Sequence, residues 1–228
     1  MEAIVLAGGF GTRLRHVVAD VPKPMAPVAG RSFLEIFLSS LARKGFSRAV
    51  LSLGFMAEKI SGHFGPHFAG LDLAYVVEDD PLGTGGATRL AVESCNQDHV
   101  FVFNGDTYLD LEVELIEHQW QARRNPIVVG RKVPDTTRYG RLVVDGDRVT
   151  NFAGKGISGP GLINAGCYVL SREALAGFSL NQPFSIETDY LVPEVAHAKV
   201  EVFVTKGMFI DIGIPKDYSL AQTLLADR

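Results

Sequence analysis

A glycine-rich segment with two arginines lies near the start of the chain and has the residue types of a phosphate site. Gly8-Gly9-Phe10-Gly11-Thr12-Arg13-Leu14-Arg15 directly follows a short apolar run. Glycines let a backbone approach a phosphate closely and present N–H groups to it, while arginine side chains add positive charge. An ordinary tight turn between a strand and a helix would have the same glycines, so this segment alone leaves both interpretations open.

The segment lacks the features of two familiar glycine motifs. Position 14 is Leu where a dinucleotide-binding fingerprint needs its third glycine, and no Gly-Lys-Ser/Thr follows as in a P-loop. Lys23 comes soon afterwards in Val21-Pro22-Lys23-Pro24-Met25, where the prolines stiffen the backbone that carries it. A lysine held in this way suits a phosphate. We therefore interpret Lys23 and the earlier arginines as one anion-binding cluster.

Two aspartates that are far apart in the sequence are candidates for a metal site. Asp106 lies in Asn104-Gly105-Asp106-Thr107 after an apolar run, and ligands of open α/β sheets bind at the carboxyl ends of such strands. Asp211 lies in Phe209-Ile210-Asp211-Ile212-Gly213, where an unpaired buried carboxylate would be costly. Two carboxylates and the oxygens of a triphosphate form the oxygen-only environment that Mg²⁺ prefers. The alternatives are a turn-forming role for Asp106 and a salt bridge for Asp211.

The first half of the chain alternates short apolar runs with longer amphipathic ones, which predicts strand-helix-strand units around a mostly parallel sheet. The expected strands are residues 3–6, 49–53, 73–77, 100–103 and 127–130, and the expected helices are residues 33–44, 86–94 and 111–124. Residues 100–103 are apolar on both faces. We expect this strand to lie centrally in the sheet, with helices on each side.

The pattern changes after Arg131. Residues 141–144 and 148–152 flank Asp145-Gly146, a dipeptide that suits a tight hairpin turn. An antiparallel ribbon is therefore expected, and it could cover one side of a cleft. Further strands are expected at residues 163–170 and 200–205, and a closing helix at residues 215–225. We expect one domain, residues 1–228, with a first half of residues 1–131 and a lid-like second half of residues 132–228.

The composition excludes several other classes of protein. With 228 residues, of which 46% are hydrophobic, the chain can bury a substantial core, and its net charge of -4 argues against non-specific nucleic-acid binding. Cys95 and Cys167 are too few for a disulfide framework, and we interpret them as buried thiols in a reducing compartment. No apolar stretch is long enough to span a bilayer. We expect a cytoplasmic protein that binds neither nucleic acid nor membrane.

Two motifs resemble the signature of a known family, the sugar-1-phosphate nucleotidyltransferases. They are Leu6-Ala7-Gly8-Gly9-x-Gly11-Thr12-Arg13-Leu14 and Pro22-Lys23-Pro24, and Asp106 and Asp211 match the family's two metal-binding aspartates. The resemblance extends from residue 3 to about residue 222. It implies a Rossmann-like α/β fold with a mixed, mostly parallel sheet. It also implies a Mg²⁺-dependent reaction that joins a nucleoside monophosphate to a sugar 1-phosphate and releases pyrophosphate.

Within this family the sequence is most similar to the bacterial D-glycero-α-D-manno-heptose 1-phosphate guanylyltransferases, which implies GTP as the nucleotide and GDP-heptose as the product. The motifs are Pro81-Leu82-Gly83-Thr84-Gly85-Gly86-Ala87, Arg138-Tyr139-Gly140, Ile163-Asn164-Ala165-Gly166, Phe184-Ser185-Ile186-Glu187 and the segment from Phe209 to Tyr218. Uridylyltransferases and mannose-1-phosphate guanylyltransferases share several of these motifs. Both remain alternatives, as does a regulatory domain that binds a nucleotide sugar without turnover.

The resemblance also implies roles for individual residues, with Asp106 and Asp211 holding Mg²⁺ and Arg13 and Lys23 acting on the phosphates. The implied nucleotide contacts are Leu6, Ala7, Gly8, Gly9, Gly11, Thr12, Arg13, Glu78, Pro81, Gly83, Thr84, Gly85, Asn104 and Gly105. The implied sugar-phosphate contacts are Lys23, Gly140, Lys155, Asn164, Glu187 and Asp189. Capping of a following helix is the alternative for the last two. Relatives usually have Glu-Lys after the hairpin, whereas this chain has Gly154-Lys155. Self-association is common among such enzymes.

Overall fold

A single mixed sheet runs through both halves of the chain. The computed structural model describes residues 1–9, 14, 18 and 21–228. The strands of the sheet are β1 (Glu2–Leu6), β4 (Arg48–Leu53), β5 (His67–Phe68), β6 (Leu71–Val77), β7 (His99–Asn104), β9 (Ile127–Val133), β10 (Arg141–Asp145), β11 (Arg148–Ala153), β12 (Gly161–Ser171) and β13 (Glu201–Thr205). Within the described residues their order is β10-β11-β13-β9-β12-β7-β1-β4-β6-β5.

The strands at the centre of this sheet bring several carboxyl ends to one edge. Strands β4, β1 and β7 are parallel neighbours, and β6 is parallel to β4. Strand β12 is antiparallel to both β7 and β9. The carboxyl ends of β1 and β7 therefore lie side by side, with Leu6 opposite Asn104. Segments that leave this edge are placed to form a site.

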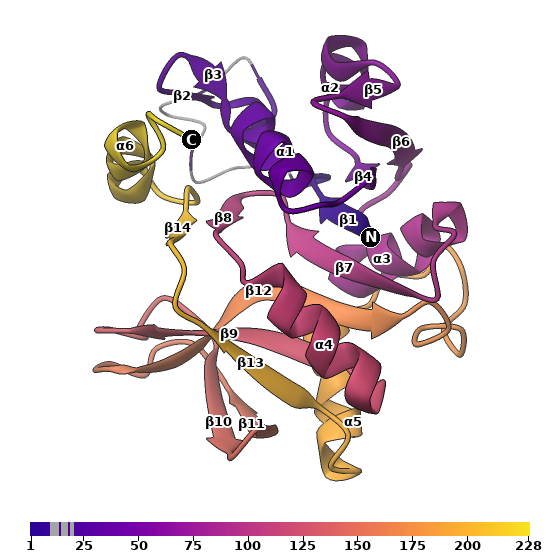
Figure 1. The fold of residues 1–228 in the computed structure, drawn as a ribbon, viewed down its shortest axis with the longest axis vertical. Helices are drawn as coiled ribbons and strands as arrows, with labels where there is room; N and C mark the ends of the chain where they lie inside the picture. The colour runs from indigo at the N-terminus through magenta and orange to yellow at the C-terminus, as the bar shows by residue number, and fades with distance from the viewer. Residues whose placement is uncertain (10–13, 15–17, 19–20) are drawn as a thin grey trace.

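Helices cover both faces of the sheet (Figure 1). The helices are α1 (Phe33–Arg43), α2 (Ala57–Phe64), α3 (Gly83–Ala91), α4 (Val113–Arg123), α5 (Val192–Ala196) and α6 (Pro215–Leu224), with a π-helix at Ile186–Leu191 and 3-10 turns at Lys23–Met25 and Val92–Ser94. Helices α1, α2, α4 and α6 share one core cluster with Ala3 and Val5 of β1, while α3 and the π-helix share the other with Ile4. Successive residues of β1 thus face opposite cores, as expected for a strand covered on both sides.

The expected fold class is confirmed, and so is the central place of the strand at residues 100–103, now β7. Helix α3 begins at Gly83, three residues before the expected start. Elements that were not expected from the sequence include α2 and the short strands β2 (Pro27–Val28), β3 (Arg31–Ser32), β5, β8 (Thr107–Leu109) and β14 (Phe209–Asp211). Among the described residues, no helix is both long and apolar enough to cross a membrane.

Helix α1 begins with a reciprocal cap that its sequence encodes. The Ser32 hydroxyl accepts a hydrogen bond from the Glu35 N–H at 3.2 Å, and the Glu35 carboxylate accepts one from the Ser32 N–H at 2.7 Å. Such a capping box satisfies N–H groups that the first turn of a helix leaves unpaired. The apolar face of α1 then packs on the sheet, where the Phe37 ring meets the Phe103 ring edge-on at 5.4 Å. This contact fixes the carboxyl end of β7.

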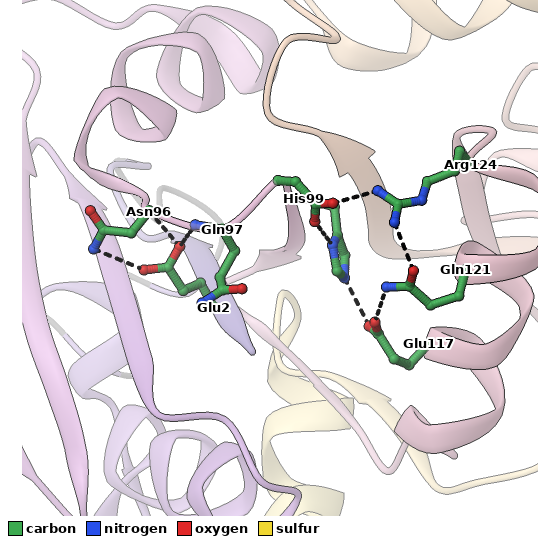
Figure 2. A network of polar contacts seen from close by, with 8 residues as sticks. Glu2, Asn96, Gln97, His99, Glu117, Gln121 and Arg124 are labelled. Carbon is green, nitrogen blue, oxygen red and sulfur yellow. Dashed lines mark hydrogen bonds and ion pairs between the residues drawn. The ribbon is translucent and has the colours of Figure 1, made fainter.

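A polar network closes the opposite end of β7 (Figure 2). The His99 ring lies between two carboxylates, with Nδ1 2.6 Å from Asp98 Oδ1 and Nε2 2.8 Å from Glu117 Oε2. Each ring nitrogen is thus within hydrogen-bond distance of a carboxylate oxygen. The ring also stacks on the buried Trp120 at 5.1 Å, while Arg124 donates to Asp98. Helix α4 is therefore attached to the start of β7 by both polar and aromatic contacts.

Removing the His99 side chain is expected to destabilise the fold without touching the site at the other end of the strand. His99→Ala removes one hydrogen-bond partner from each of two carboxylates and leaves a void beside the buried Trp120, which together cost about 2–3 kcal/mol. Urea denaturation measures this loss. His67→Ala is the matched control, because His67 makes a similar carboxylate contact to Asp72 at 2.8 Å but is 73% exposed, and surface pairs contribute about 0–1 kcal/mol. Equal losses in the two variants would contradict the role of the network.

Candidate active site

A two-stranded sheet brings the two predicted metal ligands together. Strand β14 pairs antiparallel with β8, which places Asp211 opposite Thr107. The N–H of Ile212 donates to the carbonyl oxygen of Asp106 at 3.0 Å. The Asp211 carboxylate accepts a hydrogen bond from the Gly213 N–H at 2.7 Å, so its orientation is fixed by the backbone. Two carboxylates that are far apart in the sequence thus share one place at the edge of the main sheet.

Lys23 joins these carboxylates, as the sequence predicts for a lysine between two prolines. Its ammonium group forms an ion pair with Asp106, and the lysine side chain is only 10% exposed. A β-carbon added at Gly213 would lie 2.7 Å from Asp211 Oδ1 and 3.1 Å from Lys23 Nζ. The three charged groups therefore converge around one glycine, where a larger residue would displace them.

The two carboxylates carry one more negative charge than Lys23 balances, and Arg138, which lies 3.6 Å from Asp211, is shared with Asp217. Burial, and then the nearby charge of Asp106, raise the pKa of Asp211 above its ordinary value, although Lys23, the Gly213 N–H and Arg138 oppose this shift. Among the described residues, no three His, Cys, Asp or Glu side chains gather closely enough to hold a metal by themselves. Two carboxylates with open positions for phosphate and water oxygens are the ligand set that suits Mg²⁺. A divalent cation therefore fits this pair.

A cavity of about 420 Å³ opens beside these groups at the carboxyl ends of β1 and β7. Most of the predicted nucleotide contacts line it. They are Leu6, Ala7, Gly8, Gly9, Glu78, Pro81, Gly83, Thr84, Asn104 and Gly105, together with Lys23 and Asp106. Gly105 must be small, because a β-carbon there would lie 2.7 Å from the carbonyl oxygen of Leu6. We call this space the larger cavity.

Two residues predicted to contact the nucleotide also form hydrogen bonds that hold neighbouring segments in place. Glu78 accepts hydrogen bonds from the Ser52 hydroxyl and the Leu82 N–H, each at 2.9 Å, and so holds the loop that leads into α3. Gly85 is not among the residues that line the larger cavity. Instead, its N–H donates to the carbonyl oxygen of Phe184 at 2.9 Å, and a β-carbon there would lie 2.2 Å from the Phe184 ring.

A second cavity of about 280 Å³ adjoins the first, and we call it the smaller cavity. Four predicted sugar-phosphate contacts line it, namely Gly140, Lys155, Asn164 and Glu187. Asn104 and Asp106 line both cavities, and Asp211 lines the smaller one. The two spaces therefore meet at Asn104 and Asp106, with Asp211 on the side of the smaller cavity. Two molecules bound in them would have their reacting groups on either side of Asp106.

The structure separates the two acidic residues of the π-helix. Glu187 reaches the smaller cavity. The Asp189 carboxylate instead accepts a hydrogen bond from the Ser185 N–H at 2.7 Å, and the Ser185 hydroxyl accepts bonds from the N–H groups of Glu187 and Thr188. This reciprocal arrangement caps the helix. The capping alternative therefore describes Asp189, whereas Glu187 is directed to the cavity.

Arg138 is a pocket residue to which the sequence analysis assigned no role. Its guanidinium lines the smaller cavity, forms an ion pair with Asp217 at the start of α6, and lies 3.6 Å from Asp211. The motif Arg138-Tyr139-Gly140 was recognised, but only its glycine was assigned. The positive charge of Arg138 could have indicated a role, because a phosphate bound in a cavity lined by carboxylates needs cations in addition to Lys155. Gly11, Thr12 and Arg13, which were also predicted to bind phosphate, lie outside the described residues.

Comparisons with known proteins identify the family and the relatives of this chain. A family model described as "Nucleotidyl transferase" matches residues 2–228. The chain is 36% identical to a D-glycero-α-D-manno-heptose 1-phosphate guanylyltransferase of Aneurinibacillus thermoaerophilus over 97% of both chains. It is 35% identical to a protein of the same name from Campylobacter jejuni, over 96% of this chain and 97% of the other.

A solved structure is similar over nearly the whole chain as well. The crystal structure of HddC from Yersinia pseudotuberculosis has a TM-score of 0.86 and 36% sequence identity, and the match covers 97% of each chain. A second structure of that protein, in complex with GMP-PN, has a TM-score of 0.85.

Proposed function

Because the chain belongs to the nucleotidyl transferase family, we propose that it is a guanylyltransferase that transfers GMP from GTP to D-glycero-α-D-manno-heptose 1-phosphate. The products are GDP-heptose and pyrophosphate. Two relatives of that name cover almost the whole chain, and a related structure contains GMP-PN. The observation that carries the proposal is the junction of two cavities at Asp106, with Asp211 lining the smaller of them.

We assign the larger cavity to the nucleotide and the smaller cavity to the sugar phosphate. This assignment gives the nucleotide to residues 1–131 and most of the sugar contacts to residues 132–228. The glycines at the end of β1 and the loop held by Glu78 surround the larger cavity, where backbone groups can approach phosphates and a base. Gly140, Lys155, Asn164 and Glu187 line the smaller cavity with one cation and several hydrogen-bonding groups, as a sugar phosphate requires.

The reaction is an in-line transfer at phosphorus. An oxygen of the sugar phosphate forms a bond to the α-phosphorus of GTP, while the bond from that phosphorus to the bridging oxygen of the β-phosphate breaks and pyrophosphate leaves. The attacking phosphate is already ionised at neutral pH, so no side chain has to remove a proton. The protein therefore contributes position and charge. Lys23 lines the larger cavity and pairs with Asp106, which lines both cavities, so it balances negative charge at the reacting phosphate.

Members of this family generally use a divalent metal, and we propose Mg²⁺ held by Asp106 and Asp211. When bound, the ion withdraws charge from the phosphate oxygens around the reacting phosphorus. The carboxylates serve this purpose because the β8–β14 pairing fixes their spacing and the Gly213 N–H orients Asp211. In the protein without ligands, the Lys23 ammonium group balances the negative charge of Asp106.

Pyrophosphate release with defined substrate pairs tests the proposal. The protein is incubated with Mg²⁺, each of the four nucleoside triphosphates, and heptose, mannose or glucose 1-phosphate. We expect the highest kcat/KM with GTP and D-glycero-α-D-manno-heptose 1-phosphate, and no pyrophosphate without a sugar phosphate. A preference for UTP or for mannose 1-phosphate would change the substrate assignment and retain the reaction class. No turnover with any pair would favour a regulatory domain that only binds a nucleotide sugar.

We further propose that the enzyme acts in the cytoplasm, where nucleoside triphosphates are made. Both cysteines are free and buried, which suits a reducing compartment. Burial raises the pKa of the Cys95 thiol to about 12 and that of the Cys167 thiol well above its ordinary value, so neither is a reactive thiolate. Self-association, which is common in such enzymes, is measured by sedimentation of the purified protein.

A further inference from the structure

A closed set of hydrogen bonds lies behind the wall of the smaller cavity. The Tyr168 hydroxyl donates to Glu187 Oε1 at 2.7 Å, and Asn164 Nδ2 lies 2.6 Å from the same carboxylate oxygen and 2.9 Å from the Tyr168 hydroxyl. Tyr168 is only 1% exposed and belongs to the core. We call Asn164, Tyr168 and Glu187 the triad. It joins the buried core to two residues that line the cavity.

The backbone of β12 is deformed where the triad forms. Between Asn164 and Tyr168, four steps along β12 correspond to only two along β9, from Gly130 to Val128. A regular strand would separate residues four apart by about 13 Å along its axis, so the extra residues bring the two side chains towards a common partner. Gly166 has a φ of 74° in this bulge, and a β-carbon there would lie 2.4 Å from Asn104 Nδ2. Bulges of this kind re-aim side chains next to active sites.

The hydrogen bonds within the triad use all of its side-chain donors and leave one acceptor for a ligand. Both N–H bonds of the Asn164 amide are used within the triad, and its oxygen accepts a hydrogen bond from the Gly166 N–H at 3.0 Å. The single O–H of Tyr168 is also used. Glu187 Oε1 thus accepts two hydrogen bonds, whereas no donor from the described residues is bound to Oε2. The free acceptor at this wall of the smaller cavity is the Glu187 carboxylate.

We propose that Tyr168 is a positioning residue that holds Glu187 so that its free carboxylate oxygen accepts hydrogen bonds from sugar hydroxyl groups. This inference rests on the proposed function and deepens it. It makes Asn164 a second positioning residue, because its amide has no N–H left to donate. This side of the smaller cavity therefore favours a ligand with several hydroxyl groups, which donate hydrogen bonds to the Glu187 carboxylate. It also gives the smaller cavity an acidic acceptor for sugar hydroxyls.

Steady-state kinetics of Tyr168→Phe test the inference. The phenyl ring keeps the core contacts but removes the hydroxyl, so Glu187 loses a donor and Asn164 loses an acceptor. We expect KM for the sugar 1-phosphate to rise roughly tenfold, because hydrogen bonds to charged groups are among the stronger ones. We expect kcat and KM for GTP to change less than about twofold, because the larger cavity does not include the triad. Unchanged KM for the sugar phosphate, or an equal loss for both substrates, would overturn the inference.

Matched variants separate positioning from a loss of stability. Tyr190→Phe is the control, because Tyr190 lies on the same π-helix and packs against the same core cluster, but its hydroxyl is outside the triad. It should leave both KM values unchanged. In a Glu187→Ala background, Tyr168→Phe should add no further increase in KM, whereas additive effects would show that Tyr168 acts by another route. If Tyr168→Phe yields too little folded protein, Asn164→Ala is measured instead. We again expect KM for the sugar 1-phosphate to rise while kcat and KM for GTP change little, and an unchanged KM for the sugar phosphate would again overturn the inference.

The same measurements distinguish failure of this inference from failure of the proposed function. Wild-type protein that releases no pyrophosphate with any substrate pair contradicts the proposed function itself. Active wild-type protein whose KM for the sugar phosphate is indifferent to Tyr168→Phe contradicts only the role of the triad.

Discussion

Asp106→Asn and Asp211→Asn are each expected to lower turnover by at least about a thousandfold while leaving the protein folded. A thousandfold loss corresponds to about 4 kcal/mol of activation free energy. The physical reason is that each substitution removes one negative charge from the pair that fits a divalent cation. In Asp211→Asn, the new amide oxygen can still accept the hydrogen bond that Gly213 donates to Asp211. Pyrophosphate release under saturating substrates measures the loss, and circular dichroism checks the fold.

Asp110→Asn is the matched control for these two variants. Asp110 lies four residues beyond Asp106, and its carboxylate forms an ion pair with Lys44 at 2.6 Å, away from both cavities. This variant removes the same charge from the same part of the fold, so we expect turnover within about twofold of wild type. Near-normal turnover of Asp106→Asn or Asp211→Asn would remove that residue from the proposed metal site. Raising the Mg²⁺ concentration should recover part of the lost activity if affinity for the ion is what was weakened.

Lys23→Met is expected to lower kcat about a hundredfold, which corresponds to about 3 kcal/mol. Methionine keeps much of the length and apolar volume of the lysine stem but removes the charge next to the reacting phosphate. Lys44→Met provides the comparison, because Lys44 also forms a part-buried ion pair with an aspartate and is 22% exposed. Removing it should alter stability more than kcat. A similar loss of kcat in both variants would show that Lys23 acts through the fold and not on the substrate.

Regular elements were predictable because their apolar patterns match their environment. Residues 100–103 are apolar throughout, and β7 is buried on both faces at the centre of the sheet. Asp145-Gly146 marked the hairpin between β10 and β11. Strands β8 and β14 escaped prediction because each has only three residues, too few to show a period. Their pairing depends on partners about a hundred positions away along the chain.

The acidic site was predictable and its supporting residues were not. Asp106 and Asp211 could be found because each carboxylate stands in an apolar or strand-end setting. Tyr168 lies inside the apolar strand β12 and has the sequence pattern of an ordinary core residue. Only the bulge that follows Asn164 turns its hydroxyl towards Glu187. No local pattern in the sequence encodes which hydroxyl will meet which carboxylate.

The pairing of β8 with β14 has a consequence for how the enzyme matures. Asp106 is held by the middle of the chain, whereas Asp211 arrives with the last strand before α6. A nascent polypeptide that has already emerged from the ribosome through residue 200 therefore has its glycine-rich segment and Asp106, yet lacks the second acid. With Asp211 as the proposed second metal ligand, catalysis requires β14 to pair with β8, and we expect chains that end before β14 to be inactive even where most of the sheet has formed.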